Sequence, residues 1–321
     1  MLIDAINNKI LAELDQNSRA QYSTIAKKLK LSKQSIKKRI DKLIDEKIIT
    51  QFTTIINSAI YPLNPAQIFI SLHNTSKDDK EKIVLELFNN FKIPQLTVCD
   101  GTYDLFFGLR AENIREFDCE LRKICTKYSS HIKDRKIIQL VETKLLPRTF
   151  LTGKKREIIP SDKGFHSKIN KTQLSPLKEM DYAILNKLAE NPKISYVSLA
   201  NELNITTQTA MNKVKNLEKS NIIIGYSYLL DAHKFVHYQL LLAFTTITKE
   251  LDQKLNNYFL INPNVIFVSK TLGEFDYTIA FETNNFEDYR KFNEEFKKEF
   301  STHLKSFVPL LVTDFVKLKF L

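Results

Sequence analysis

The sequence predicts an α+β protein in which two copies of a helical unit alternate with two copies of a βαββαβ unit. Residues 10–57 recur without a gap 174 positions later, as residues 184–231. The segment behind each copy recurs at an offset of 172, with a spacing that alternates between strand and helix. Repeats of this length indicate two copies of one folding unit. The positions with the same residue type in both helical copies are Ile10/Ile184, Leu11/Leu185, Leu14/Leu188, Asn17/Asn191, Ala26/Ala200, Leu29/Leu203, Leu43/Leu217, Ile48/Ile222 and Ile49/Ile223.

Apolar residues at helical spacing predict three helices in each helical unit. In the first copy the inward faces are Ile6, Ile10, Leu11 and Leu14, then Ile25, Ala26 and Leu29, then Ile36, Ile40 and Leu43. Ser23 is the expected N-cap of the second helix, and Ser32 and Thr206 cap the third helix of each copy, because a hydroxyl can accept a free backbone N–H there. The β-leaning stretches QFTTII and GYSYLL follow the third helices. Three helices and a β extension are typical of a winged helix-turn-helix.

The segment behind each helical unit predicts strands and helices in the order βαββαβ. In the first copy the strands are expected at 67–73, 95–99, 105–110 and 136–145, and the helices at 77–91 and 113–128. In the second copy the strands are expected at 239–245, 265–271, 277–282 and 311–320, and the helices at 249–260 and 286–303. This order predicts a ferredoxin-like sandwich with an antiparallel sheet.

Between the two halves lies a stretch with prolines, glycines, seven basic residues and no periodicity, which reads as an extended linker. The expected domains are a winged helix-turn-helix at 1–60, a sandwich at 66–146, the basic linker at 147–176, a second winged helix-turn-helix at 177–232 and a second sandwich at 238–321.

Net charge is +11 and is unevenly placed, which suggests a polyanionic partner. Residues 1–60 carry 11 Lys/Arg against 6 Asp/Glu and residues 146–174 carry 7 against 2, whereas residues 175–231 carry 6 against 6. No apolar run approaches the length that spans a bilayer and no signal-peptide core is present, so no membrane partner is expected. Three unpatterned cysteines predict neither a disulfide framework nor a zinc site, and fit a reducing cytoplasm.

The two motif types, in this order, resemble the Lrp/AsnC (feast/famine) transcription regulators over nearly the whole chain, twice. The resemblance rests on STIAKKLKLSKQSIKKRIDKL with EKIITQF, on SLANELNITTQTAMNKVKNLE with NIIIGY, and on the Gly-x-aromatic-Asp turns in DGTYD and LGEFD. Members usually carry one such pair and dimerise, so the chain looks like a fused dimer that self-associates further through its sandwich domains. The chain departs from the pattern where the glycine before the wing is Lys47 or Asn221, and where the recognition-helix arginine, kept as Arg39, becomes Lys213.

The resemblance implies that double-stranded DNA is read by the third helix of each helical unit. Long donors in the first turn of such a helix reach base edges, and cations along its sides meet phosphates. The alternative is that these residues form the solvated face of an ordinary helix. Because three lysines of the first copy are absent from the second, the second copy is expected to contact DNA weakly or to act as a structural partner. The candidate DNA-binding residues are Ser32, Lys33, Gln34, Ser35, Lys37, Lys38 and Arg39 in copy one and Thr207, Gln208 and Thr209 in copy two.

The two turns between the middle strands of the sandwiches are the candidate effector sites. By resemblance, a small molecule, often an amino acid, binds near such a turn. The alternative is that the turn only joins two strands, since glycine permits positive φ and aspartate can cap a backbone group. The candidate residues are Gly101, Tyr103, Asp104, Gly273, Phe275 and Asp276.

No pattern of catalytic, metal-ligating or cofactor-binding residues stands out, so neither an active site nor a cofactor is predicted. The main interpretation is a DNA-binding regulator that works as an intramolecular pseudo-dimer. The alternative is an enzyme similar to the fused siroheme decarboxylases, which resemble this family in fold. Those enzymes tend to carry an arginine-rich, aromatic stretch before the third sandwich strand, whereas this chain has QLTVCDGTYD and IFVSKTLGEFD. A third reading is a module that only assembles.

Overall fold

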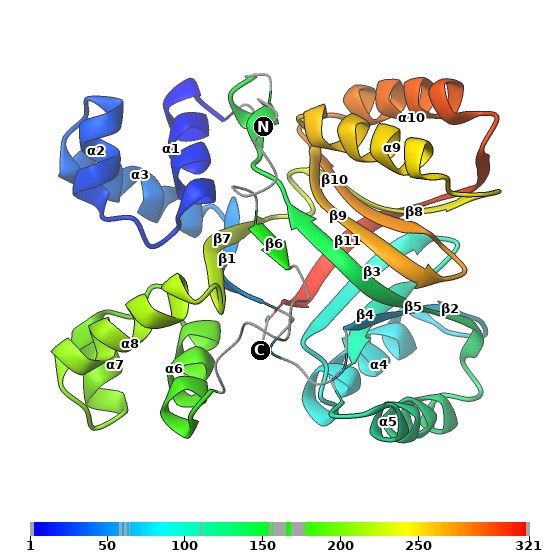
Figure 1. Cartoon of the computed structure of the whole chain (residues 1–321), viewed down its shortest axis with the longest axis horizontal. Helices are drawn as coiled ribbons and strands as arrows, with labels where there is room; N and C mark the ends of the chain where they lie inside the picture. The colour runs from blue at the N-terminus through cyan, green and yellow to red at the C-terminus, as the bar shows by residue number, and fades with distance from the viewer. Residues whose placement is uncertain are drawn as a thin grey trace.

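The structure is a computed structural model that describes residues 3–57, 60, 63, 65–109, 111–153, 156, 165–167 and 177–318. Two helical units lie at one end of the molecule and a β-rich body with four covering helices lies at the other (Figure 1). The α+β class, the two winged helix-turn-helix units and the two βαββαβ units predicted from the sequence are confirmed.

Each winged helix unit contains three helices and one strand. The first comprises α1 (Ala5–Gln16), α2 (Tyr22–Leu29), α3 (Lys33–Asp45) and β1 (Ile49–Ile56). The second comprises α6 (Glu179–Glu190), α7 (Tyr196–Glu202), α8 (Thr207–Lys219) and β7 (Ile223–Leu230). Ser32 and Thr206 cap α3 and α8 as expected, but the expectation for Ser23 is wrong. The second helix begins at Tyr22 after Gln21, so Ser23 lies inside its first turn.

The two winged helix units are joined through their wings. Strands β1 and β7 form an antiparallel pair, here called the wing ribbon, in which Thr53 lies opposite Ser227. These two residues are equivalent in the repeat, so the pseudo-twofold axis passes between them. Each strand also packs into the other copy's core: Tyr228 and Leu230 join the first helical core, and Ile56 joins the second. Each helical core is therefore completed by the other half of the chain.

The two sandwich units have the expected element order. The first contains β2 (Ala66–Leu72), α4 (Lys77–Asn90), β3 (Gln95–Gly101), β4 (Leu105–Leu109), α5 (Ile114–Lys127) and β5 (Ile132–Leu145). The second contains β8 (Val236–Phe244), α9 (Lys249–Ile261), β9 (Val265–Gly273), β10 (Tyr277–Thr283), α10 (Phe286–Phe300) and β11 (Leu304–Leu318). The last strand of each unit begins four to seven residues before its predicted start, and α10 ends at Phe300 rather than at residue 303.

The two sandwich sheets merge into one closed barrel. Strand β5 pairs with β2 of its own unit and with β9 of the other, and β11 pairs with β8 and β3 in the same way. All the pairings are antiparallel, and the hydrogen-bonded order β2-β4-β3-β11-β8-β10-β9-β5 returns to β2. Because successive side chains of a strand point to opposite faces, one face of each strand points outward, toward the helices or solvent, and the other lines the barrel interior.

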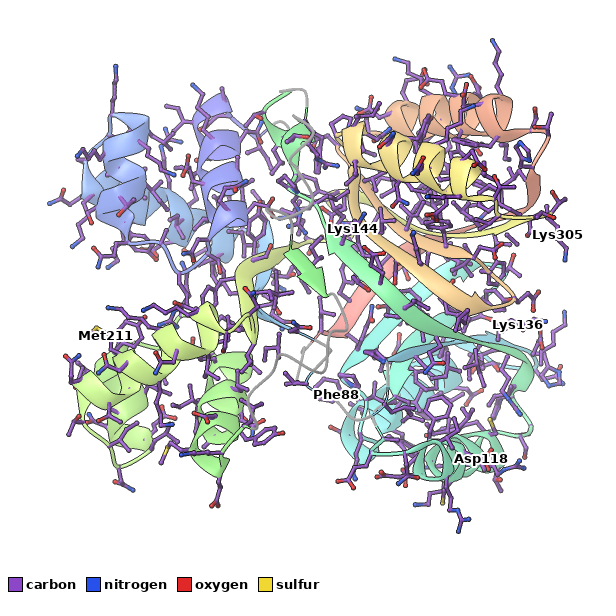
Figure 2. All side chains as sticks on the ribbon, viewed as in Figure 1. Phe88, Asp118, Lys136, Lys144, Met211 and Lys305 are labelled. Carbon is purple, nitrogen blue, oxygen red and sulfur yellow. The ribbon has the colours of Figure 1, made fainter. Side chains whose placement is uncertain are left out.

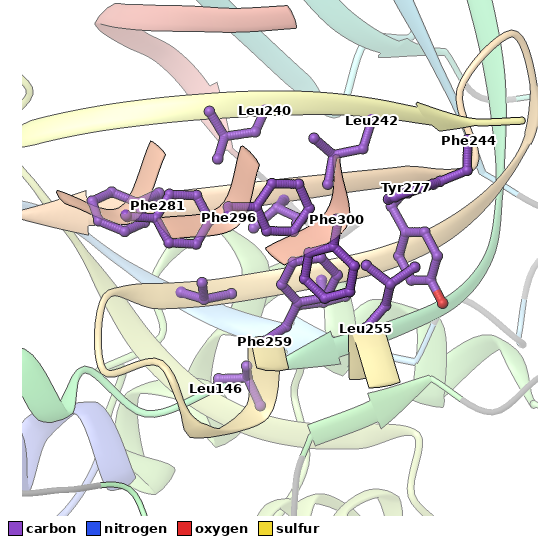
Figure 3. Close-up of a cluster of buried hydrophobic side chains, with 14 of the residues drawn as sticks. Leu146, Leu240, Leu242, Phe244, Leu255, Phe259, Tyr277, Phe281, Phe296 and Phe300 are labelled. Atoms are coloured by element: carbon purple, nitrogen blue, oxygen red, sulfur yellow. The ribbon is translucent and has the colours of Figure 1, made fainter. Parts of the chain in front are cut away.

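The outward faces of the strands pack against helices in two apolar cores. In the second unit, Phe259, Phe296 and Phe300 from the helices meet Leu240 and Leu242 from β8 (Figure 3). The first unit has the corresponding core beneath α4 and α5, around Phe107 and Ile124. A smaller cluster, which includes Phe69, Phe106 and Leu241, fills part of the barrel interior. Full burial of each such side chain stabilises the fold by about 1.5–3 kcal/mol.

Part of the expected linker is docked on the body rather than extended. The short helix η2 (Thr149–Leu151) buries Leu151 in the first helical core, and β6 (Phe165–Ser167) pairs with β5. Arg156 is buried, and its guanidinium donates to the carbonyls of Pro147, Leu260 and Val265. Most of the remaining linker, with all of its lysines, lies outside the described residues.

Candidate nucleic-acid interface

Helix α3 presents a basic, solvent-facing first half. Ser32 Oγ accepts a hydrogen bond from the backbone N–H of Ser35 at 3.1 Å, which fixes the start of the helix. Lys33, Lys37 and Lys38 are exposed beyond this cap, and none of them makes an ion pair with a residue that the structure describes. Gln34 is exposed and Ser35 is half-buried. The first two turns thus carry three cations that are free to meet phosphate oxygens or base edges.

Arg39 is directed back toward α1 instead of outward. Its Nη1 donates to Asp4 Oδ2 at 2.8 Å and to Asn7 Oδ1 at 2.9 Å. The equivalent contact in the second unit joins Lys213 Nζ to Asp181 Oδ1 at 2.7 Å. The structure therefore gives Arg39, a candidate DNA contact, a role in holding α3 against the first helix.

Helix α8 has the same start but a different surface. Thr206 Oγ1 accepts from the backbone N–H of Thr209 at 3.1 Å, and Thr207, Gln208 and Thr209 are exposed. The Gln208 side chain donates to Asn212 Oδ1 at 3.0 Å, and Met211 stands at the position of Lys37 (Figure 2). The exposed cations of α8, Lys215 and Lys219, lie in its second half, where α3 has aspartates. The two helices thus start in the same way, but the exposed cations lie mainly in the first half of α3 and in the second half of α8.

Each wing begins at a residue in the left-handed region. Lys47 has φ of 53° and Asn221 has φ of 55°, so both non-glycine residues adopt the conformation for which the family pattern favours glycine.

Side-chain contacts connect the two winged helix units in addition to the wing ribbon. The Arg19 guanidinium lies 5.3 Å from the ring centres of Tyr196 and Tyr226, and Lys193 Nζ lies 4.1 Å from the ring centre of Phe52. These contacts hold the two recognition helices in one arrangement.

At the turns between the middle strands, both glycines lie at close contacts between the two sandwich units. Gly101 and Gly273 have φ of 139° and 132°. A Cβ at Gly101 would lie 2.9 Å from the carbonyl oxygen of Pro309, and one at Gly273 would lie 2.8 Å from that of Ile137. These are the places where each unit's turn meets the other unit's long strand, so glycine is needed for the barrel to close.

The aromatic and acidic residues of the same turns also have structural partners. Tyr103 and Phe275 are buried in the interior cluster of the barrel. Asp104 Oδ2 accepts from the backbone N–H of Leu72 at 2.7 Å, and Asp276 Oδ2 accepts from that of Phe244 at 2.8 Å. All six candidate effector residues therefore contribute to joining strands, and their role in binding a ligand stays a prediction.

Sequence reasoning missed a buried ionic cluster between the first winged helix and the second sandwich. Arg148 Nη1 pairs with Asp15 Oδ1 at 2.6 Å, and its Nε pairs with Glu282 Oε2 at 2.6 Å. The Arg148 guanidinium also lies 4.9 Å from the ring centre of Tyr228. His237 is only 2% exposed; its Nδ1 lies 3.2 Å from Glu282 Oε1 without the alignment of a hydrogen bond, and its Nε2 has no hydrogen-bond partner among the described residues.

Within this cluster, neighbouring opposite charges shift the pKa values of Glu282 and Arg148 in favour of their charged forms. Burial disfavours the charged form of Glu282, but Arg148 and His237 offset that effect and lower the carboxyl pKa from 4.5 to about 2. Burial disfavours the charged form of Arg148, but the two carboxylates hold its pKa above its ordinary value. No single sequence motif contains these residues, because Asp15, Arg148 and Glu282 come from positions more than 130 apart.

A cavity of about 560 Å³ lies beside this cluster, between the wing ribbon and the barrel interior. The ribbon contributes Thr53 and Ser227, and the barrel contributes inward-facing residues such as Gln67, Gln239 and Ala280.

Over the described residues, no group of three or more His, Cys, Asp or Glu could hold a metal ion, and no helix is long and apolar enough to cross a membrane. All three cysteines are free thiols.

Two capped recognition helices on a shared wing ribbon define a winged helix DNA-binding protein. Residues 3–44 match the AsnC-type helix-turn-helix domain, and residues 177–224 match a winged helix-turn-helix DNA-binding domain. The regulator LysM of Saccharolobus solfataricus is 33% identical over 126 residues, which cover 38% of this chain and 83% of LysM. The leucine-responsive regulatory protein of Haemophilus influenzae is 26% identical over 127 residues, which cover 39% of this chain and 76% of that protein. The chain belongs to the Lrp/AsnC family of transcription regulators.

A solved structure similar to nearly the whole chain is that of the siroheme decarboxylase NirDL. It has a TM-score of 0.60 and 14% identity, and the match covers 98% of this chain and 93% of NirDL. At that identity the similarity shows a shared tandem fold and nothing about activity.

Proposed function

We propose that this regulator binds DNA as an intramolecular pseudo-dimer in which α3 is the main reader and α8 a weaker contact. The observation that carries the proposal is the difference between two otherwise equivalent helices. Lys33, Lys37 and Lys38 are exposed and unpaired on the described surface of α3, whereas Thr207, Met211 and Asn212 occupy the same places on α8. Cations near phosphates release counterions and provide most of the salt-dependent affinity. The target site is therefore asymmetric.

Fluorescence anisotropy with DNA from upstream of the protein's own gene tests this proposal. The double variant Lys33→Ala/Lys37→Ala is expected to weaken binding at least about tenfold and to reduce the slope of log K against log salt by about 2. The matched control is Lys215→Ala/Lys219→Ala, which removes the same charge from the second half of α8. Equal losses in the two double variants would contradict the assignment of α3 as main reader.

We propose that the protein also responds to a small metabolite and assembles further through its barrel. The described outer face of β5 and β9 supports the second part, because Ile137, Val141 and Leu272 are exposed there, Leu272 to 63%. Apolar side chains grouped between helices favour contact with another copy. We place the protein in the cytoplasm, where the free thiols of Cys99, Cys119 and Cys125 would stay reduced.

We propose a regulator without catalytic activity over the alternative of a siroheme decarboxylase. NirDL has been solved with an iron-uroporphyrin III analogue, a tetrapyrrole with many carboxylates. Unpaired cations bind carboxylates strongly through charge-assisted hydrogen bonds. Among the described residues that line the cavity, Arg148 is paired with two carboxylates and Lys92 pairs with Glu116 at 3.1 Å. The absorption spectrum of iron-uroporphyrin is expected to stay unchanged on mixing with the protein, and a shifted band would favour the enzyme.

A further inference from the structure

The cavity beside the ionic cluster occupies one end of the barrel interior. Gln67, Gln239 and Gly108 line it, and each lies two residues along its strand from Phe69, Leu241 or Phe106 of the interior cluster. Residues two apart on a strand share a face, so the cavity and the cluster divide one interior space. The interior cluster closes one end and the wing ribbon covers the other. Small eight-stranded barrels have room for one small ligand, and 560 Å³ is a usual size for such a site.

Polar side chains without partners point to a ligand in this space. Gln67 is 4% exposed, and its Oε1 accepts no hydrogen bond from the described residues. His237 also lines the cavity, and its Nε2 is equally unpartnered. Because a buried polar group without a hydrogen bond is costly, two such groups beside one cavity favour an occupant with hydrogen-bonding groups.

The charges around the cavity decide which ligand fits. Arg148 is surrounded by Asp15 and Glu282, and every one of their four carboxylate oxygens already accepts from Arg148. The three groups together carry one net negative charge before His237 is counted. Among the described residues that line the cavity, Lys92 and Arg148 are already paired with carboxylates, so a ligand carboxylate would find no unpaired lysine or arginine there, which favours a neutral ligand. The remaining walls are mostly apolar, with Leu140, Phe267 and Val312 among them.

We propose that this cavity binds one neutral, mostly apolar small molecule whose amide or hydroxyl groups bond Gln67 and His237. Calling that molecule the effector rests on the proposed regulator function, whereas the binding site stands on the barrel geometry. The ligand would touch both strands of the wing ribbon and both sandwich units, since the cavity lining includes Thr53 and Ser227 as well as Gln239. It would thus meet all the units that hold the two recognition helices.

A pair of fluorescent probes that differ in one charged group tests the proposal on the full-length protein. N-phenylnaphthylamine is neutral and apolar with one N–H donor, and anilinonaphthalene sulfonate adds an anionic group to the same ring system. The neutral probe is expected to bind with one-to-one stoichiometry and increased emission. The sulfonate is expected to bind at least about tenfold more weakly. Equal binding of both probes would overturn the assignment of a neutral ligand.

Variants that fill the cavity locate the bound probe. Ala280→Phe adds an aromatic ring from β10, and Leu140→Trp adds one from β5, both into the cavity. Each is expected to weaken binding of the neutral probe at least about tenfold. Val197→Phe adds a ring at an exposed site on α7 and is the matched control, with unchanged binding expected. The inference is wrong if the neutral probe binds both filling variants as tightly as the natural protein, with circular dichroism showing all of them folded.

DNA binding, measured without any probe, separates this inference from the proposed function. If the protein binds the neutral probe, loses that binding in the filling variants and does not bind DNA, the cavity site is supported and the regulator function is contradicted. If the protein binds DNA but does not bind the neutral probe, the regulator function is supported and the cavity site is contradicted.

Discussion

Two glycines on the turns between strands illustrate how single residues permit the barrel to close. Gly101 and Gly273 combine positive φ with carbonyl oxygens of the other unit at the position of a Cβ. We expect Gly101→Ala or Gly273→Ala to lower the free energy of unfolding by about 2–3 kcal/mol, because the added methyl group forces the two units apart. Gly153→Ala is the control, since Gly153 also has positive φ but no atom within 4 Å of an added Cβ. It should cost only about 1 kcal/mol in urea denaturation. Equal costs at the two kinds of site would contradict the role of close contact.

Lys193 is a partly buried cation whose charge opposes folding. Its ammonium lies over the rings of Tyr22 and Phe52, and burial lowers its pKa from 10.5 to about 8. Between these two values the unfolded chain binds more protons than the folded one, so this residue makes stability rise with pH in that window.

The prediction is that Lys193→Met melts at a higher temperature than the natural protein at pH 7, and that the difference shrinks by pH 10. Thermal melts followed by circular dichroism at the two pH values provide the measurement. Lys215→Met, at an exposed position of α8, is the control and should show no such dependence on pH. A lower melting temperature for Lys193→Met at pH 7 would mean that its contact with the rings outweighs the cost of burial.

At the level of elements, one arginine connects α1, the segment after β5, and β10. Arg148→Met would leave the carboxylates of Asp15 and Glu282 buried without their cation, and we expect a loss of about 3–5 kcal/mol in the free energy of unfolding. Arg290→Met removes an arginine that is paired with Glu287 and Glu294 on the exposed side of α10. That control should change stability by less than about 1 kcal/mol. Urea denaturation measures both losses. Similar losses in the two variants would show that the buried cluster stabilises the fold no more than an exposed ion pair does.

The same cluster makes the junction sensitive to acid. The folded-state pKa of Glu282 is about 2 and its ordinary value is 4.5, so its stabilising contribution is complete above 4.5 and disappears as the pH falls toward 2. In acid titrations, Glu282→Gln should therefore lose less stability than the natural protein over this range. A parallel decline of the two proteins would contradict the lowered pKa.

The elements with local signals could be predicted from the sequence. The helix caps at Ser32 and Thr206 follow from hydroxyls that precede a helical pattern, and the recognition helices are confirmed in place. Gln21 as the N-cap of α2 could not be predicted in this way, because its side chain makes no capping hydrogen bond. The docked segment around Arg148 also lacks a local signal, because its order comes from contacts with distant residues.

At the scale of the molecule, the repeat predicted the parts but not how they close. Closure of the sheet depends on which half of β5 pairs with β2 and which half pairs with β9. The register between distant strands cannot be predicted from the periodicity of a sequence. The cavity was equally unpredictable, since its lining combines both wings and both sandwich units. The duplication predicts two copies of each unit, and the resemblance to a family of dimers is needed to predict their pairing as a pseudo-dimer.

Because the halves share three strand pairings, cutting the chain between them should not separate them. The pairings β1–β7, β3–β11 and β5–β9 all join one half to the other. We expect the protein, nicked by a protease site inserted between residues 157 and 164, to elute as one species in size-exclusion chromatography. Its DNA affinity should be unchanged, and the intact protein with the same insertion is the control. Elution as two half-sized species would mean that the covalent connection is needed to hold the pairings.

If the connection is not needed for cohesion, the one-piece chain has another effect. Separate halves with matching strand edges could assemble in like pairs as well as unlike pairs, and each combination would carry a different set of recognition helices. A single polypeptide supplies one half of each kind, already beside its counterpart at a high effective concentration. Tyr228 of the second half packs in the first helical core, whereas its equivalent in the first half is the smaller, polar Thr54, so this contact favours the unlike pair. Fusion thereby fixes the stoichiometry of the two different helical units in every molecule that the cell makes.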